Sequence, residues 1–309
     1  MLSRFRYKPS TYAGLAVHHE RLSMVRLRQV KKQIVIEGFA SIHLPMGSST
    51  NENMHELAEA GQAIRQLVLA TDAEHCKAAL ALPALQVITK RIRVPAYLTE
   101  SERVLEIRSN LNHYLPGISD QLYFDFIPIE QQVSEIELQF IAARAEQVEA
   151  WLALTQAAGL KIDVADVDVY AIARGMQSIA ARFSKEIFVI LDLDKTAAQL
   201  ILLKQGKVIS VYPIVVDAED ILLQQIKRGL QVFSAAEQLI PVEKMILTGC
   251  FTDFDRLKML FESQLNISVE QLESFGSVAM DSRLNAIKLN ASVKDLLVAY
   301  GLALRGFSA

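Results

Sequence analysis

The chain has 309 residues, of which 51% are hydrophobic and 22% are charged, and its formal net charge at pH 7 is −3. This composition excludes a disordered or collagen-like protein, and the length favours two compact units over one. The near-neutral charge provides no global field that would recruit nucleic acid. No apolar run reaches the ~18–20 residues of a transmembrane helix, and the first ten residues lack the apolar core of a signal peptide.

The first quarter of the chain is predicted to contain strands and one helix. Apolar, β-branched runs separated by short polar turns are typical of strands. Apolar residues at helical spacing predict the helix. The expected strands are residues 12–17, 23–27, 33–43 and 76–82, and the expected helix is residues 54–68.

Basic residues crowd the first tenth of the chain, opposed by a single acid, Glu20. They predict a solvated polar face. The alternative is a weak contact with anionic lipid, to which each basic side chain near the surface would contribute ~1 kcal/mol. The basic residues are Arg4, Arg6, Lys8, Arg21, Arg26, Arg28, Lys31 and Lys32.

Residues 86–162 have the order strand–helix–strand–strand–helix, which predicts a small inserted α/β unit. Thr99 and Glu102 have the spacing of a capping box at the start of its first helix. Pro116 and Gly117 are expected to end that helix. The expected elements are strands 86–94, 122–129 (an edge strand, because it contains Pro128) and 136–142, and helix 147–158, ended by Gly159.

Residues 187–211 predict three consecutive strands, and the turn that contains Gly206 is typical of a hairpin. Their order repeats the N-terminal part, so the chain is expected to contain two similar halves. An apolar strand such as 187–192 must be covered on both faces. The other elements expected in this region are strands 162–169, 199–203, 208–211 and 244–247, and helices 170–183, 218–236, 254–265 and 293–304.

No set of residues for nucleophilic catalysis or zinc binding stands out. The six histidines lack the i, i+4 spacing of helical zinc ligands, and no GxSxG motif is present. Cys76 and Cys250 match no metal-ligand spacing and are expected to be reduced core thiols. The sequence therefore disfavours a serine hydrolase and a zinc site.

Asp192, at the end of a predicted strand, is the first candidate for a binding site. A carboxylate beside a tight turn suits hydrated Mg²⁺ and a phosphate, whereas a solvated strand end is the alternative. The following turn, Asp194-Lys195-Thr196, has no glycine to let backbone N–H groups approach a phosphate. Gly249 is the second candidate, because a glycine at a strand end lets a ligand lie close to the backbone. Its alternative is an ordinary βα turn.

Five segments resemble the PilM family of actin-like cytoplasmic proteins of type IV pilus machines, and more distantly FtsA, over nearly the full length. They are VITKRIRVPAYLTESE, RSNLNHYLPG, LQFIAARAEQVEAWLALTQAAGLKIDVADVDVYAIAR, RGLQVFSAAEQ and MDSRLNAIKLN…LLVAYGLALRGF. The resemblance implies an α/β protein with the duplicated RNase H-like actin/FtsA-type ATPase fold and a small inserted α/β subdomain. It places the first actin-like subdomain in residues 1–85, 163–185 and 295–309, the insertion in 86–162, and the second half in 186–294.

The resemblance also implies a cytoplasmic scaffold, peripheral to the inner membrane, that couples other pilus assembly proteins to motor components. Its partner would be the N-terminal cytoplasmic tail of PilN, in a groove between the first subdomain and the insertion. Self-association is left open. The expected groove residues, whose alternative is ordinary core and turn packing, are Val94, Pro95, Tyr97, Tyr114, Leu115 and Pro116.

The family's nucleotide motifs are only partly kept. In the first phosphate loop Gly14 is kept, but Ala16 and Ser23 stand at the aspartate and lysine positions. The second loop keeps Asp192 and has Asp194 in place of its glycine. The paired glycines of the adenosine motif become Gly249-Cys250, those near residue 215 become Val215-Val216, Asp166 matches a family aspartate, and Asp168 replaces a glutamate.

If ATP and Mg²⁺ bind, the resemblance implies Gly14, Asp192, Thr196 and Gly249 as contacts, with Asp192 nearest the metal. Each lost charge-assisted contact costs ~1.5–3 kcal/mol, whereas micromolar affinity amounts to only about −8 kcal/mol. We therefore expect a scaffold with a degenerate nucleotide cleft, as in HofM or MshI, and weak or absent ATPase activity. The rival hypotheses are an ATP-binding switch and a sugar kinase, and Ala16 disfavours the kinase.

Overall fold

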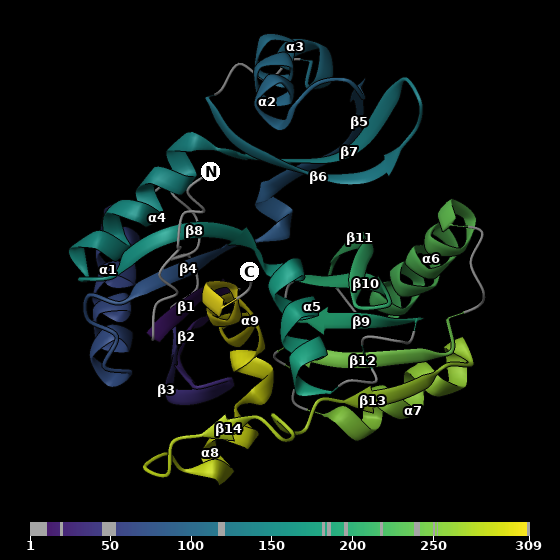
Figure 1. The fold of residues 1–309 in the computed structure, drawn as a ribbon. Coiled ribbons are helices and arrows are strands. Elements are labelled where there is room, and N and C mark those ends of the chain that lie inside the picture. Colours follow the sequence, from purple (N-terminus) through teal and green to yellow (C-terminus); the bar gives the residue numbers. More distant parts are fainter. Residues whose placement is uncertain are drawn as a thin grey trace. The chain divides into compact units, whose positions relative to one another are not determined.

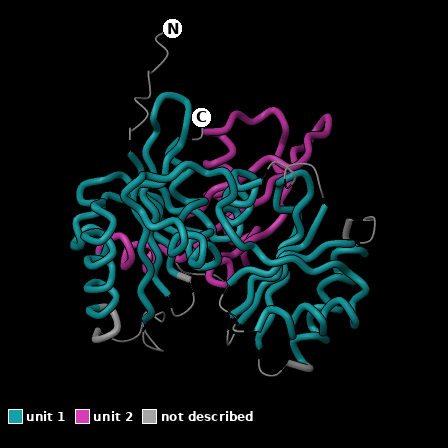
Figure 2. Tube along the Cα trace, turned by 90° about the horizontal axis from the view of Figure 1, so that it is seen from below, with its two compact units in different colours: residues 1–83, 154–309 teal, residues 84–153 magenta. Residues whose placement is uncertain are grey.

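A computed structural model of the chain divides into two units, coloured separately in Figure 2. The larger unit comprises Met1–Pro83 and Leu154–Ala309, and the smaller comprises Ala84–Ala153. The structure describes residues 11–18, 21–44, 54–116, 121–180, 183, 187–194, 197–216, 219–237, 242–249, 251 and 253–307.

The first sheet of the larger unit has, among the described residues, six strands in the order β14-β3-β2-β1-β4-β8 (Figure 1). β1, β2 and β3 form an antiparallel meander, and β4 and β8 continue the sheet in parallel. The strands are β1 (Thr11–His18), β2 (Arg21–Val30), β3 (Gln33–His43), β4 (Lys77–Leu82), β8 (Lys161–Val167) and β14 (Ala279–Met280).

Both faces of this sheet are covered. Residues 12–17 of β1 are all buried, although neighbouring residues of a strand point to opposite faces. Helix α1 (Met54–Ala70) packs against β2 and β3, and helix α9 (Val293–Leu304) packs against β1, β2 and β4. α9 also packs along helix α5 (Asp168–Ile179), and most of its residues are buried. Burial on both faces explains why the central strands β1 and β4 are almost continuously apolar.

The second sheet, counted within the same described ranges, has five strands in the order β11-β10-β9-β12-β13. The predicted hairpin is present, and its turn has positive φ at both Gln205 (52°) and Gly206 (74°), as a type I′ turn requires. Apolar residues of two helices, such as Phe233 and Phe261, complete its core. The elements are β9 (Ile187–Leu193), β10 (Ala197–Lys204), β11 (Lys207–Val215), β12 (Lys244–Gly249), β13 (Ser268–Gln271), α6 (Glu219–Glu237) and α7 (Phe254–Leu265).

The two sheets repeat one topology. In each, a three-strand antiparallel meander pairs through its first strand with a parallel fourth strand, and the fourth strand pairs with a parallel fifth. The order β3-β2-β1-β4-β8 therefore corresponds to the order β11-β10-β9-β12-β13. This correspondence confirms the prediction of two similar halves.

The smaller unit is a three-stranded antiparallel sheet, counted over the described residues, in the order β5-β7-β6, packed against two short helices. Ile107 of α2 and Leu115, which directly follows α3, meet Ile92, Leu138 and Phe140 of the sheet in one core. β6 is an edge strand, as predicted from its proline. The elements are β5 (Val87–Pro95), β6 (Leu122–Gln131), β7 (Glu135–Arg144), α2 (Glu100–Ser109) and α3 (Leu111–Tyr114).

Local signals in the smaller unit are partly confirmed. Thr99 caps α2, and both hydrogen bonds of the capping box are present. The helix nevertheless ends at Ser109, before the predicted stop at Pro116, because Asn110 leaves the helical conformation and its side chain bonds the Glu106 carbonyl oxygen at 3.1 Å. Asparagine side chains typically compete with the backbone for the hydrogen bonds of a helix.

Two boundaries differ from the predicted ranges. Helix α4 (Ala145–Ala157) passes from the smaller into the larger unit, where the Arg65 guanidinium donates to the Ala158 carbonyl oxygen at 3.1 Å. This contact with α1 attaches residues 154–162, expected in the insertion, to the larger unit. β14, expected in the second half, pairs in parallel with β3 of the first sheet. A two-residue strand gives no signal in the sequence.

Three further findings concern helices. Among the described residues, no helix is long and apolar enough to cross a membrane. Ile221 of α6 is 40% exposed, whereas Leu222 and Ile226 of the same helix are buried. Helix α8 (Ala286–Ala291), not predicted, precedes α9.

Candidate functional site

A buried polar cluster lies at the end of β9, where the apolar run of that strand gives way to Asp192. Sheet pairing sets Asp192 opposite Gln199 on β10 and Thr248 on β12. The Thr248 hydroxyl donates to Asp192 Oδ1 at 3.1 Å, and Gln199 Nε2 donates to Asp192 Oδ2 at 3.0 Å. All three side chains are at most 3% exposed. Both oxygens of the carboxylate therefore accept hydrogen bonds from neutral donors.

The same amide reaches a second carboxylate. Gln199 Nε2 lies 3.4 Å from Oδ2 of Asp168, the first residue of α5, whose Oδ1 accepts from the Val169 backbone N–H at 2.7 Å. Asp168 is 2% exposed. Gln199 Oε1 is buried and has no hydrogen-bond partner in the described part of the chain. Because only the NH₂ group of an amide can donate, the two carboxylates fix which way this amide faces.

Gly249 lies directly beside Asp192. Its φ is +89°, and a Cβ at this position would lie 2.3 Å from the Leu193 carbonyl oxygen and 2.9 Å from Asp192 Oδ1. Glycine is needed because the backbone approaches β9 so closely. The structure thus brings two of the predicted nucleotide contacts together, and Asp192 and the β9 backbone occupy the space beside Gly249.

Gly14 lies elsewhere, in the middle of β1, against α9. A Cβ here would lie 2.1 Å from the Ala299 carbonyl oxygen. Ala16 and Ser23, predicted to replace an aspartate and a lysine of the first phosphate loop, pair directly across β1 and β2 and are both buried. Thr196 lies outside the described residues. Helix packing accounts for Gly14, and no described contact links it to Asp192.

Asp166 joins the last strand of the first sheet to both central helices. Its Oδ2 accepts from the Arg174 guanidinium at 2.8 Å, and the same guanidinium donates to the Gly301 carbonyl oxygen at 2.8 Å. The Arg305 guanidinium lies 3.9 Å from the Asp166 carboxylate. Nearby, burial and a hydrogen bond to Asp163 raise the pKa of Tyr12. These contacts give Asp166 a structural role between β8, α5 and α9.

The six predicted groove residues fall into three classes. Val94 (1% exposed) and Leu115 (5% exposed) are part of the core of the smaller unit. Tyr97 is 83% exposed, and Pro116 is also exposed. Pro95 and Tyr114 are half-buried, and the Tyr114 carbonyl oxygen accepts from Lys90 Nζ at 2.7 Å. Only the exposed and half-buried residues are accessible to a partner, and their role in binding stays a prediction.

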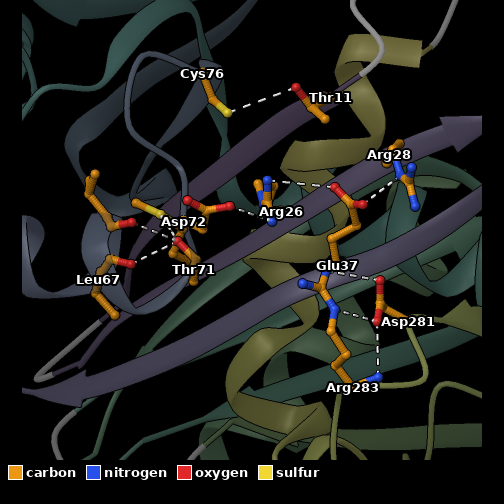
Figure 3. Close-up of polar contacts among 12 residues, drawn as sticks. Thr11, Arg26, Arg28, Glu37, Leu67, Thr71, Asp72, Cys76, Asp281 and Arg283 are labelled. Atoms are coloured by element: carbon orange, nitrogen blue, oxygen red, sulfur yellow. Dashed lines mark hydrogen bonds and ion pairs between the residues drawn. The ribbon is translucent and has the colours of Figure 1, made fainter.

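All three basic side chains on β2 lie close to carboxylates. Arg26 lies 3.6 Å from Glu37 and 3.3 Å from Asp72, and Arg28 also pairs with Glu37 (Figure 3). Arg21 lies 3.0 Å from Asp295 of α9. Each arginine of β2 is therefore opposed by at least one negative charge. Lys31 and Lys32 are exposed in the β2–β3 turn, whereas Arg4, Arg6 and Lys8 lie outside the described residues.

Asp281 and Arg283, which follow β14 beside β3, form an ion pair. The Arg283 guanidinium and backbone N–H bond to Asp281 and lower the pKa of that carboxyl to about 2 (Figure 3).

Cys76, predicted to be a core thiol, is half-buried beside the Thr11 hydroxyl, 3.9 Å away. Cys250 lies outside the described residues.

Gln199 and Thr248 were not predicted as site residues. Gln199 carried a signal, because it is the one polar residue within the apolar run AAQLILL of β10. Such a residue is buried only where a polar partner exists. Thr248 had no signal beyond its position next to Gly249, since only the pairing of β12 with β9 sets it opposite Asp192.

Comparison with known proteins adds a family and a fold. A family model described as type IV pilus assembly protein PilM matches residues 14–212 and 217–307. The solved structure of the "PilM-PilN type IV pilus biogenesis complex" matches with a TM-score of 0.83 at 24% identity, covering 98% of this chain and 100% of that chain. The predicted family resemblance is therefore confirmed.

Two more distant structures share the fold. A protein with actin-like ATPase fold from Bacteroides thetaiotaomicron VPI-5482 has a TM-score of 0.51 at 8% identity, with coverage of 94% of this chain and 98% of that chain. The ethanolamine utilization protein EutJ from Carboxydothermus hydrogenoformans has a TM-score of 0.51 at 11% identity, with coverage of 96% and 90%. The actin-like fold expected from the sequence is confirmed.

Proposed function

The chain belongs to the PilM family of type IV pilus assembly proteins, and we propose that it is a cytoplasmic scaffold that binds the N-terminal cytoplasmic tail of PilN. In this proposal the scaffold is held at the inner membrane through its partner and couples PilN to motor components and other assembly proteins. It binds no nucleic acid, and ATP hydrolysis is weak or absent. The observation that carries the proposal is the match over 98% of the chain to a protein solved in a PilM–PilN complex.

The smaller unit has features that suit an extended peptide. β5 is an edge strand, paired with β7 alone in the described sheet. An edge strand offers unpaired backbone N–H and C=O groups, and side chains beside it provide pockets for alternate residues of a peptide. Pro95 ends β5, and the exposed Tyr97 follows it. These residues support a peptide-binding role for this edge.

The proposal is tested by titrating the purified full chain with a synthetic peptide of the PilN N-terminus in a calorimeter. We expect micromolar affinity or better, which corresponds to about −8 kcal/mol. Tyr97→Ala should weaken binding about tenfold, because exposed aromatic residues often dominate peptide and protein interfaces. Absence of heat from a folded protein would reject the proposed function.

Tyr123→Ala is the matched control. Tyr123 is a 52% exposed tyrosine of the same unit, on β6 and outside the predicted groove. It should leave the affinity within about twofold, since residues outside a hot spot contribute little. Equal losses in both variants would place the peptide elsewhere on the unit. Val94 and Leu115 are poor choices for this test, because substituting a core residue changes stability as well as binding.

A further inference from the structure

We infer that the Gln199 amide occupies the position of a divalent cation between Asp168 and Asp192, so that α5 is linked to the second sheet without a nucleotide. The inference deepens the proposed scaffold function and rests on it. The fold implies a site for ATP and Mg²⁺, but the residues around Asp192 do not fit the metal ion.

The surroundings of Asp192 do not suit a hydrated Mg²⁺ ion. Mg²⁺ requires octahedral oxygen coordination at about 2.0–2.1 Å and usually keeps several water molecules. Asp192 is 2% exposed, its Oδ1 accepts from Thr248, and its Oδ2 accepts from Gln199. The backbone of Gly249 closes a further side, since a Cβ there would lie 2.9 Å from Oδ1. A cation would have to displace these groups.

The Gln199 amide provides what a cation would otherwise supply. Its NH₂ group has two hydrogens and lies 3.0 Å from Asp192 Oδ2 and 3.4 Å from Asp168 Oδ2. A buried carboxylate needs a hydrogen-bond donor or a positive partner. The arrangement leaves Gln199 Oε1 buried without a partner among the described residues, which costs free energy. The free energy gained from hydrogen bonds to the two carboxylates therefore exceeds the cost of leaving this carbonyl oxygen without a partner among the described residues.

The bridge joins the two halves of the larger unit. Asp168 begins α5 directly after β8, the last strand in the meander-and-parallel order of the first sheet. Gln199 and Asp192 belong to the second sheet. The first sheet also lacks charged groups for a phosphate, because the buried Ala16 and Ser23 stand where the family motif predicts an aspartate and a lysine. An internal polar bridge thus replaces the ligand that would cross between the halves.

Thermal unfolding of the full chain in chelator, in millimolar Mg²⁺ and in millimolar Mg-ATP tests the inference. The wild-type Tm should be the same within about 1 °C in all three, because a ligand stabilises only when its concentration exceeds its Kd. Gln199→Glu places a third carboxylate between the other two. Its Tm in chelator should fall by about 5 °C or more, and Mg²⁺ should restore at least half of the loss.

Gln225→Glu is the matched control for the charge change. Gln225 of α6 is half-buried, and its amide donates to the Val215 carbonyl oxygen at 3.1 Å. Its Tm should not depend on Mg²⁺. A Gln199→Glu protein with the wild-type Tm in chelator would overturn the inference, as would a folded variant that does not respond to Mg²⁺.

The wild-type measurement decides the question even if Gln199→Glu does not fold. A rise of several degrees with Mg-ATP, checked by equilibrium dialysis against labelled ATP, overturns the inference and favours an ATP-binding switch. Binding of ATP together with the PilN peptide would reject this inference alone. Binding of neither ligand would reject only the proposed function.

Discussion

Replacing Gly14 by alanine should destabilise the protein, although the change adds a single methyl group. The new Cβ would lie 2.1 Å from the Ala299 carbonyl oxygen, 2.6 Å from the Ala303 backbone nitrogen and 2.8 Å from the Leu302 Cβ. Two of these atoms belong to the backbone of α9, so no side-chain rotation relieves the overlap. Overpacking of this kind costs about 1–3 kcal/mol and sometimes more, and rigid neighbours favour the upper end.

The magnitude can be followed by thermal unfolding monitored by circular dichroism. A loss of about 3 kcal/mol corresponds to a fall in Tm of about 6 °C or more for a unit of this size. Gly61→Ala is the matched control, because it makes the same chemical change in α1, where the nearest atom to the new Cβ is the Leu154 side chain at 3.4 Å. A glycine inside a helix costs about 0.5–1 kcal/mol relative to alanine. Gly61→Ala should therefore raise the Tm.

The two variants should thus shift the Tm in opposite directions. A Gly14→Ala protein within about 1 °C of the wild type would refute the packing explanation, because a 1 kcal/mol loss already lowers Tm by about 2 °C. It would return Gly14 to consideration as a phosphate-loop glycine. In that case the variant should keep its stability and lose a Tm shift with Mg-ATP that the wild type shows.

Two smaller effects should follow from the smaller unit and from the edge of the first sheet. Thr99→Ala should destabilise α2 by about 1 kcal/mol, and amide hydrogen exchange in Glu100–Ser109 should become faster. Thr99→Ser keeps the hydroxyl group and should leave the exchange rates unchanged. Equal exchange rates in the two variants would show that the cap is dispensable. Because Arg283 lowers the folded pKa of Asp281 to about 2, ionised Asp281 should stabilise the protein above the unfolded pKa of about 4 and lose this effect as pH falls from about 4 to about 2. Arg283→Met should return the Asp281 pKa, measured by NMR titration, toward about 4; an unchanged value would assign the shift to another group.

Features that depend on a few consecutive residues were predictable. The Gln205-Gly206 turn, the Thr99 capping box and the edge position of β6 all follow from the conformations that particular residue types favour. The repeated strand order was also visible, because the apolar runs of both halves are long and regular. The family resemblance provided the fold class, since it rests on long ordered segments and not on single motifs.

Features that depend on contacts between distant segments were not predictable. Val94 and Leu115 were expected in a groove, but the packing of α2 and α3 on the sheet places both in the core. A short apolar stretch has the same composition in a core and in a pocket, so sequence alone cannot separate the two. The parallel pairing of β14 with β3 was missed for a related reason, since two residues carry no periodicity.

The sequence predicted a duplicated α/β protein of the PilM family, and the family match and the repeated strand order confirm this. That its nucleotide motifs are incomplete stays a prediction. The same motifs pointed to Asp192, Gly249 and Gly14 as candidate contacts. What these residues contact is seen only in the folded chain: Asp192 lies with Gly249, Thr248 and Gln199, and Gly14 lies against α9. The reason is that sheet register and helix packing, which join residues far apart in the chain, decide what each side chain touches.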